Sequence, residues 1–272
     1  LLGLVVGSFL NVVIHRLPIM MERAWKQQCR ELFEPDSDEA DTGAAFNLVT
    51  PRSRCPHCGH LIGALENIPL LSFLLQRGRC RECGARISAR YPLVEVLTGI
   101  LSLAVVMHFG MTWEAAGAML LTWGLVALTF IDLDHHLLPD DITLPFLWLG
   151  IVAALFGVFT DLESAVIGAV AGYLALWSIF HLFRLLTGKE GMGYGDFKLL
   201  AMLGAWMGWQ QLPAIILLSS LVGAVVGVAM IIIRGHDRNI PIPFGPYLAA
   251  AGWIALLWGD DLTRWYLGYA TA

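Results

Sequence analysis

The chain has 272 residues, of which 57% are hydrophobic and 14% are charged, and its formal net charge at pH 7 is −5. Soluble globular domains carry about 25% charged residues, so this composition excludes an ordinary soluble domain and indicates that lipid covers much of the surface. The sequence lacks the basic, aromatic-interleaved patch that is typical of nucleic-acid-binding proteins. We therefore expect membrane lipid, and no nucleic acid, among the partners.

The chain opens inside an apolar run, LLGLVVGSFLNVV, that ends before Pro18. This run is shorter than the roughly 20 residues of a spanning helix, and we interpret residues 1–17 as a first transmembrane helix that lacks its beginning. Residues 18–90 are poor in long apolar runs. We interpret them as a polar insert, followed at 91–272 by a membrane bundle of about seven helices.

Seven apolar segments follow the insert. They lie near residues 91–110, 113–131, 142–160, 163–187, 196–209, 213–233 and 246–262. Together with the first helix they predict an all-α polytopic membrane protein with about eight transmembrane helices.

The basic residues set the expected orientation. If the insert is cytoplasmic and the chain crosses eight times, the loops at 132–141, 188–195 and 234–245 lie on the same side as the insert. In that case 16 of the 17 Lys and Arg residues lie at or near the cytoplasmic side, and only Arg264 lies outside. This distribution follows the positive-inside rule, so we expect a multi-pass membrane protein whose insert faces the cytoplasm.

The insert contains two CxxC pairs, formed by Cys55, Cys58, Cys80 and Cys83. Each pair is followed by a glycine, Gly59 or Gly84, which suits the tight turn of a zinc knuckle. The spacing is close to that of a four-cysteine zinc ribbon, whose closed site is structural. Two disulfides or a redox-active pair are the competing interpretation, although disulfides rarely persist in the reducing cytosol.

Two acidic motifs occur at the edges of apolar segments. The first, FIDLDHHLLPDDITLP, contains Asp132, Asp134 and Asp140, and the second, GMGYGDFK, contains Asp196 after alternating glycines. The predicted topology brings both motifs to the same side at similar depth. Two carboxylates meeting there could share one proton, as in aspartic proteases, while Lys198 would tune the site or contact lipid headgroups.

Each acidic residue also has a less specific interpretation. Asp140 and Asp196 begin apolar helices, where a carboxylate complements the helix dipole. Glu95 lies within an apolar segment, where a carboxylate is expensive. It could serve as an internal hydrogen-bond partner or as a site residue.

Several motifs together resemble the type IV prepilin peptidases, the GxGD-type aspartic membrane proteases that act as leader peptidase and N-methyltransferase of bacterial pilus and type II secretion systems. The resemblance rests on GSFLNVVIHRLP, the CxxC pairs, ENIPLLSF, RYPLVEVLTG, FIDLDHHLLPD and GMGYGDFKLLA, and spans nearly the whole chain.

The resemblance implies that Asp132 and Asp196 are the catalytic pair. It makes Asp134, Asp140, Gly193, Gly195 and Lys198 supporting residues. It also implies a location in the bacterial inner membrane, with cleavage of prepilins and pseudopilins after a Gly on the cytoplasmic side. The new N-terminal residue would then be methylated with S-adenosylmethionine by the insert.

The polar residues of the ENIPLLSF motif, Glu66 and Asn67, are the candidates for the methyltransferase site.

Two other functions compete with this interpretation. A proton-coupled secondary transporter would also use glycine-interrupted helices and carboxylates near the membrane edge. However, the sequence shows no paired halves, and a transporter leaves the zinc ribbon unexplained. A non-enzymatic assembly scaffold would leave the aspartate motifs unexplained.

Overall fold

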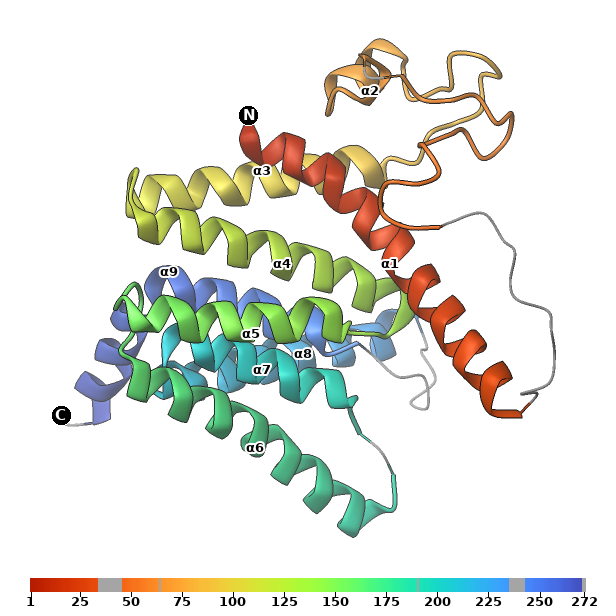
Figure 1. Cartoon of the computed structure of the whole chain (residues 1–272). Helices are drawn as coiled ribbons and strands as arrows, with labels where there is room; N and C mark the ends of the chain where they lie inside the picture. Colours follow the sequence, from red (N-terminus) through yellow and green to blue (C-terminus); the bar gives the residue numbers. More distant parts are fainter. Residues whose placement is uncertain (34–45, 64, 190, 235–242, 271–272) are drawn as a thin grey trace. The chain divides into compact units, whose positions relative to one another are not determined.

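The computed structural model describes residues 1–33, 46–63, 65–189, 191–234 and 243–270 (Figure 1). These residues are mostly helical. The chain divides into an N-terminal unit, 1–103, and a C-terminal unit, 104–272. Each unit is described by itself below.

The N-terminal unit is built on two helices, α1 (Leu2–Phe33) and α3, which begins at Arg90 and ends at Phe109 in the next unit. Small residues let the two helices approach closely. A Cβ on Gly7 would lie 2.7 Å from Cα of Glu95, and one on Gly3 would lie 2.6 Å from Oγ of Ser102. Figure 1 shows α1 and α3 side by side where these glycines lie.

Helix α1 extends beyond the apolar run and contains Pro18 within it. Two residues before Pro18, the buried Arg16 donates hydrogen bonds to the main-chain carbonyls of Asn47, Leu48 and Pro51, at 2.9, 3.4 and 2.6 Å. Since a guanidinium carries five N–H donors in a rigid fork, one side chain fixes the start of the described insert on α1.

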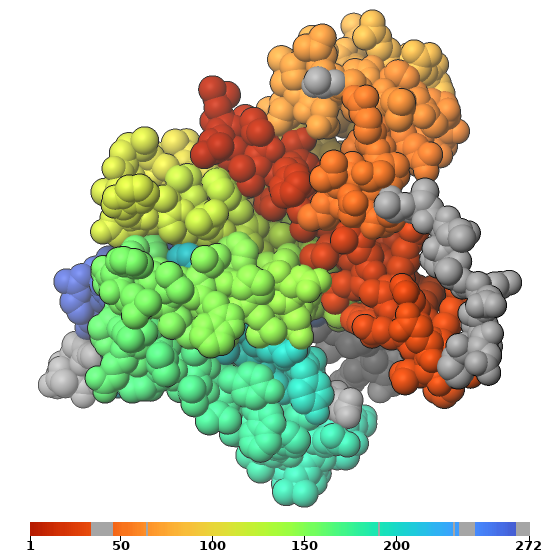
Figure 2. All heavy atoms as spheres, viewed as in Figure 1, coloured from red at the N-terminus to blue at the C-terminus, as the bar shows by residue number. Residues whose placement is uncertain are grey.

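The insert has little regular structure between residues 46 and 89. It contains a short 3₁₀ turn, Leu65–Asn67, and helix α2 (Leu71–Leu75). Two isolated antiparallel bridges join Arg54 to Leu61 and Arg79 to Arg86. These residues gather into one lobe in the space-filling view (Figure 2, orange). So small a lobe needs support beyond its apolar core.

In the described residues from Trp113 onward, the C-terminal unit has six helices and one 3₁₀ turn. They are α4 (Trp113–His135), α5 (Asp140–Leu155), α6 (Leu162–Thr187), α7 (Tyr194–Met207), the 3₁₀ turn Trp209–Gln211, α8 (Leu212–Arg234) and α9 (Gly245–Ala270). Local signals start and stop some of them. Thr112 and Asp161 accept hydrogen bonds from N–H groups in the first turns of α4 and α6, and Gly188 ends α6 in the left-handed conformation.

Helix α7 is the most buried helix of the C-terminal unit and packs against α5, α6 and α9. The α6–α7 contact passes through Gly168 and Gly204, where a Cβ on either would strike the other's backbone. On the opposite side, Nε1 of Trp206 donates a 2.8 Å hydrogen bond to the carbonyl of Phe146 in α5. The position of α7 is therefore fixed from two directions.

Five helical segments in the described residues are long and apolar enough to cross a membrane. They are α1, α3, α4, α6 and Trp209–Met230. The expected number of eight crossings is therefore not confirmed, although each expected segment is helical. Helices α5 and α7 have 16 and 14 residues. At 1.5 Å per residue they are only about 24 and 21 Å long, shorter than the roughly 30 Å of a hydrocarbon core.

Candidate active site and metal centre

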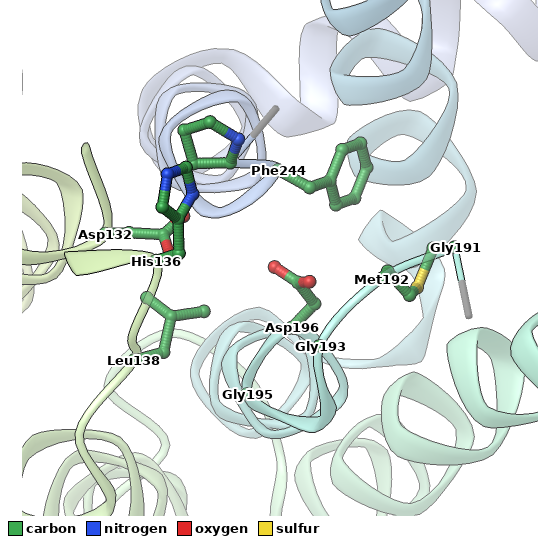
Figure 3. A pocket seen from close by; sticks show the side chains of 10 residues that line it. Asp132, His136, Leu138, Gly191, Met192, Gly193, Gly195, Asp196 and Phe244 are labelled. Carbon is green, nitrogen blue, oxygen red and sulfur yellow. The ribbon is translucent and has the colours of Figure 1, made fainter. Parts of the chain in front are cut away.

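Asp132 and Asp196, which the sequence indicates as a catalytic pair, line one pocket of about 320 Å³ in the C-terminal unit. Both residues are buried, at 6% exposure each. Figure 3 shows them on different walls, with Asp132 coming from α4 and Asp196 from α7. Both carboxylates face the same pocket (Figure 3). Two carboxylates that share an enclosed site can divide the roles of acid and base.

Asp132 lies in the last turn of α4, just before the chain leaves the helix through His136 in a left-handed conformation. Its Oδ2 accepts a 3.0 Å hydrogen bond from the main-chain N–H of Gly245, the first residue of α9. Thus the end of one helix and the start of another meet at this carboxylate.

Asp196 is the third residue of α7. The N-cap of this helix is Gly193, which has no side chain to cap it. Asp196 therefore lies in the first turn, where the dipole favours a carboxylate, but is not itself the N-cap. Likewise, Pro139 and not Asp140 precedes α5 as its N-cap. The helix-dipole interpretation thus remains compatible with both residues, and the shared pocket distinguishes Asp196.

The alternating glycines before Asp196 do not adopt left-handed backbone conformations; Gly193 has φ −84° and ψ 155°. Their role here is close approach. A Cβ on Gly195 would lie 2.8 Å from Cβ of Leu138, and one on Gly191 would lie 3.0 Å from the ring of Phe183. The GxGxGD motif thus lets the loop and the start of α7 pack against neighbours with no side chain between them.

The supporting residues divide into two groups. Nζ of Lys198 lies 2.7 Å from both carboxylate oxygens of Asp140, so this pair joins the first turns of α7 and α5. Asp134 is exposed and does not line the pocket that holds Asp132 and Asp196.

Sequence reasoning missed part of the pocket wall, namely His136, Leu138, Met192, Pro243 and Phe244. Gly245, which contacts Asp132, was missed as well. The available signal was the FGP sequence at the start of the last apolar segment. Proline is favoured at the first turn of a helix, and glycine lets the backbone approach another group closely.

The four predicted metal ligands, Cys55, Cys58, Cys80 and Cys83, come together in the insert. Their sulfur atoms all lie within 4.8 Å of one another. The Cys55–Cys83 and Cys58–Cys80 sulfur distances are both 3.9 Å. A regular tetrahedron of 2.3 Å Zn–S bonds places its sulfurs about 3.8 Å apart. The cluster can therefore hold one metal ion of this kind, and these sulfurs are too far apart for disulfides.

The backbone around the cysteines fits a pair of knuckles. Gly59 and Gly84 have φ of +74° and +69°, the left-handed region expected for them. Their N–H groups bond to the carbonyls of Cys55 and Cys80, both at 2.9 Å. Main-chain hydrogen bonds from Cys58 and His57 lower the pKa of the Cys55 thiol to about 7, whereas burial and the neighbouring cysteine sulfurs raise the pKa of the Cys58 thiol to about 12.

Glu66 is engaged within the insert. Its Oε2 accepts a 3.0 Å hydrogen bond from the N–H of Gly63 and lies 3.0 Å from Nε2 of His60. The Gly63 N–H and the His60 imidazole lower the pKa of this carboxyl. Glu66 thus closes the loop after the first knuckle, and Asn67 beside it is exposed.

Glu95 has a defined hydrogen-bond partner. This buried carboxylate on α3 accepts a 2.7 Å hydrogen bond from the N–H of Leu70, a residue in a left-handed conformation with φ 58°. Of the two interpretations of Glu95, the structure therefore supports the internal hydrogen-bond partner.

Comparisons with known proteins identify the family. Residues 1–109 match the Bacterial Peptidase A24 N-terminal domain, and residues 119–228 match the Type IV leader peptidase family. The chain is 65% identical over 267 residues to a prepilin leader peptidase/N-methyltransferase of Aeromonas hydrophila, covering 98% of this chain and 92% of that protein. The chain belongs to the type IV leader peptidase family.

Other relatives carry the same name. Those of Pseudomonas aeruginosa and Legionella pneumophila are 62% and 49% identical, each over 99% of this chain and over 92% and 93% of their own length. No solved structure matches the chain. Membership of the leader peptidase family agrees with the resemblance seen in the motifs and gives no support to the transporter alternative.

Proposed function

We propose that this protein removes the leader of type IV prepilins and pseudopilins at the cytoplasmic face of the inner membrane and then methylates the new N-terminus. The observation that carries the proposal is the pocket in which Asp132 and Asp196 meet. Family membership adds the reaction, because relatives at 49 to 65% identity are named for both activities.

The pocket supports hydrolysis of a peptide bond by the two aspartates. One carboxylate, in its charged form, takes a proton from a water that attacks the scissile carbonyl carbon. The other, protonated, donates its proton to the carbonyl oxygen. The proton taken from water by the first carboxylate then passes to the leaving amine, and collapse of the tetrahedral intermediate returns a proton to the second carboxylate. Neither residue can perform both steps at once, so the chemistry requires the pair.

The walls of the pocket suit an extended peptide with a small residue at the cut. Gly191, Gly193 and Gly195 line one side without side chains, and Met192 and Phe244 add apolar surface (Figure 3). A backbone can therefore approach Asp196 closely, while an apolar side chain next to the cut meets Met192 or Phe244. This arrangement agrees with cleavage after Gly, before the apolar helix of a prepilin.

The cytoplasmic orientation rests on the distribution of charge. The insert and the loops at 132–141, 188–195 and 234–245 share one side in the topology that places 16 of the 17 basic residues inside. A basic leader would then stay in the cytosol while the apolar part of the prepilin lies in the bilayer, with the junction at the depth of the aspartates.

The insert would supply the second activity. Its four-cysteine cluster has the dimensions of a structural zinc site, and we assign zinc the role of stabilising this small lobe. The methyl donor is S-adenosylmethionine, which supplies the methyl group to the free amine after cleavage. Glu66 holds the loop that carries Asn67, and Asn67 is the exposed polar group available for binding there.

A direct test mixes the purified full-length protein with a prepilin, with and without S-adenosylmethionine, and follows the products by mass spectrometry. Loss of the leader in both samples, and a further gain of one methyl group only with the donor, is the expected result. An intact prepilin in both samples, with the enzyme folded, would contradict the proposal.

A further inference from the structure

One residue outside both acidic motifs contacts Asp132, an aspartate that lines the pocket. Gly245 begins α9, 113 residues after Asp132 in the sequence, and its N–H contacts the Asp132 carboxylate. We propose that Gly245 is a positioning residue of the peptidase: its main-chain N–H fixes Asp132 in the orientation from which the other oxygen acts on substrate. This proposal rests on the proposed role of the aspartate pair.

The donor at Gly245 is available because of where it lies in the helix. The first four N–H groups of an α-helix have no acceptor within the helix, and α9 begins at this residue. One of these unpaired donors is satisfied by Oδ2 of Asp132 in a buried bond of 3.0 Å. Hydrogen bonds to an ionised carboxylate are stronger than those between neutral groups. The contact therefore holds Oδ2 in place and leaves Oδ1 to act on the substrate.

The contact also requires that residue 245 have no side chain. A Cβ at this position would lie 2.6 Å from Oδ2 of Asp132, 3.1 Å from its Cγ and 3.2 Å from Cδ2 of Leu138. Contacts under 3.0 Å force a shift, and the group that must move is the carboxylate itself or the helix start. Glycine therefore allows the backbone to approach the aspartate closely.

A second contact sets the register of α9 against α4. Nε1 of Trp253 donates a 3.1 Å hydrogen bond to Oγ1 of Thr122, which is fully buried. Along α9 this contact lies eight residues from Gly245, about 12 Å, and along α4 it lies ten residues from Asp132, about 15 Å. The two helices are thus joined at two levels. By fixing the position of α9 along α4, the Trp253 contact helps to place the Gly245 N–H against the Asp132 carboxylate.

The test compares Gly245→Ala with Gly252→Ala in the full-length protein. The control is the same substitution on the same helix, where the three atoms nearest the new Cβ all belong to the side chain of Leu203 and none to an aspartate. We expect Gly245→Ala to lower kcat for a prepilin peptide by roughly 10²-fold, the size of effect produced by misplacing a reacting group by about 1 Å. KM, the melting temperature and methylation of a pre-cleaved peptide should change little.

Three outcomes would overturn the proposal: near-wild-type kcat in Gly245→Ala, an equal fall in Gly252→Ala, or a rise in KM with kcat unchanged. If Gly245→Ala fails to fold, Thr122→Val tests the proposal instead. This substitution keeps the shape of Thr122 but removes the hydroxyl that accepts the hydrogen bond from Trp253. A fall in kcat at constant KM then supports the positioning role, and an unchanged kcat overturns it. Retained cleavage in Asp132→Asn would instead contradict the proposed function, so the two failures are distinguishable.

Discussion

Lys198 lies 2.7 Å from both carboxylate oxygens of Asp140 and so joins the first turn of α7 to the first turn of α5. Neither residue lines the pocket that holds Asp132 and Asp196. Lys198 is two residues after Asp196 and within the same helix, so the ion pair helps to fix the helix that carries Asp196. The pair therefore supports the site from outside.

We expect Asp140→Asn and Lys198→Met to retain measurable cleavage of prepilin. The pair is partly exposed, with side-chain exposures of 29% for Lys198 and 51% for Asp140, and exposed pairs contribute only about 0.2–1 kcal/mol. Initial rates of cleavage would test this expectation, with Asp134→Asn as an exposed acidic control. Complete loss of activity in folded Asp140→Asn protein would show that Asp140 takes part in the chemistry.

Zinc should be found at about one ion per chain in freshly prepared, reduced protein. Cys55→Ser should destabilise the insert more than the membrane bundle, because the cluster joins two knuckles within one small lobe. Metal analysis combined with limited proteolysis would measure both effects, and Cys29→Ser, which changes an exposed cysteine outside the cluster, is the matched control. Metal-free protein with an intact insert would remove the zinc assignment.

Methylation and cleavage should be separable. Glu66→Ala removes the acceptor for Gly63 and the partner of His60, so the loop that carries Asn67 should loosen and methylation should fall while cleavage continues. Glu82→Ala, on the second knuckle, controls for the loss of one carboxylate from the insert. The two activities are measured on the same samples by mass spectrometry. Parallel loss of both in folded Glu66→Ala and Asn67→Ala proteins would show that the sites are not separate.

Glu95 should stabilise the insert by accepting the hydrogen bond from the Leu70 N–H, and its negative charge should not be needed. Glu95→Gln keeps an oxygen for the Leu70 N–H and should behave nearly as wild type, whereas Glu95→Leu leaves that donor unpaired, at a cost of about 1–3 kcal/mol. Thermal unfolding and protease sensitivity of the insert would distinguish the variants. Equal loss of methylation in both, with stability unchanged, would instead indicate a direct chemical role for Glu95.

Much of the architecture could be predicted from local patterns. The eight expected apolar segments are all helical, and the CxxC spacing with its following glycines predicted both the cluster and its left-handed turns. The number of membrane crossings is harder to predict from the sequence, because an apolar run indicates that a helix is buried but not whether lipid or protein covers it. Helix α7 illustrates this: it is apolar because it packs against α5, α6 and α9.

The site was predicted only in part for a similar reason. Asp132 and Asp196 stand out in sequence because carboxylates are rare beside apolar segments. The contribution of Gly245 is a main-chain N–H, which every non-proline residue has, and its importance depends on where α9 begins in space. Phe244 and Met192 likewise look like ordinary apolar residues until the fold brings them to the pocket.

Cleavage assays on Asp132→Asn, Asp196→Asn and the double variant test most directly whether the two aspartates form one catalytic unit. Asn keeps the shape of Asp but cannot exchange the required proton, so each single change should abolish cleavage without unfolding the protein. The double variant should be no worse, because members of one unit are not additive. If Asp196 only stabilised the start of its helix, its loss would cost about 1 kcal/mol of stability or less and cleavage would persist. Folded Asp196→Asn protein that cuts prepilin at a near-wild-type rate would contradict the catalytic pair.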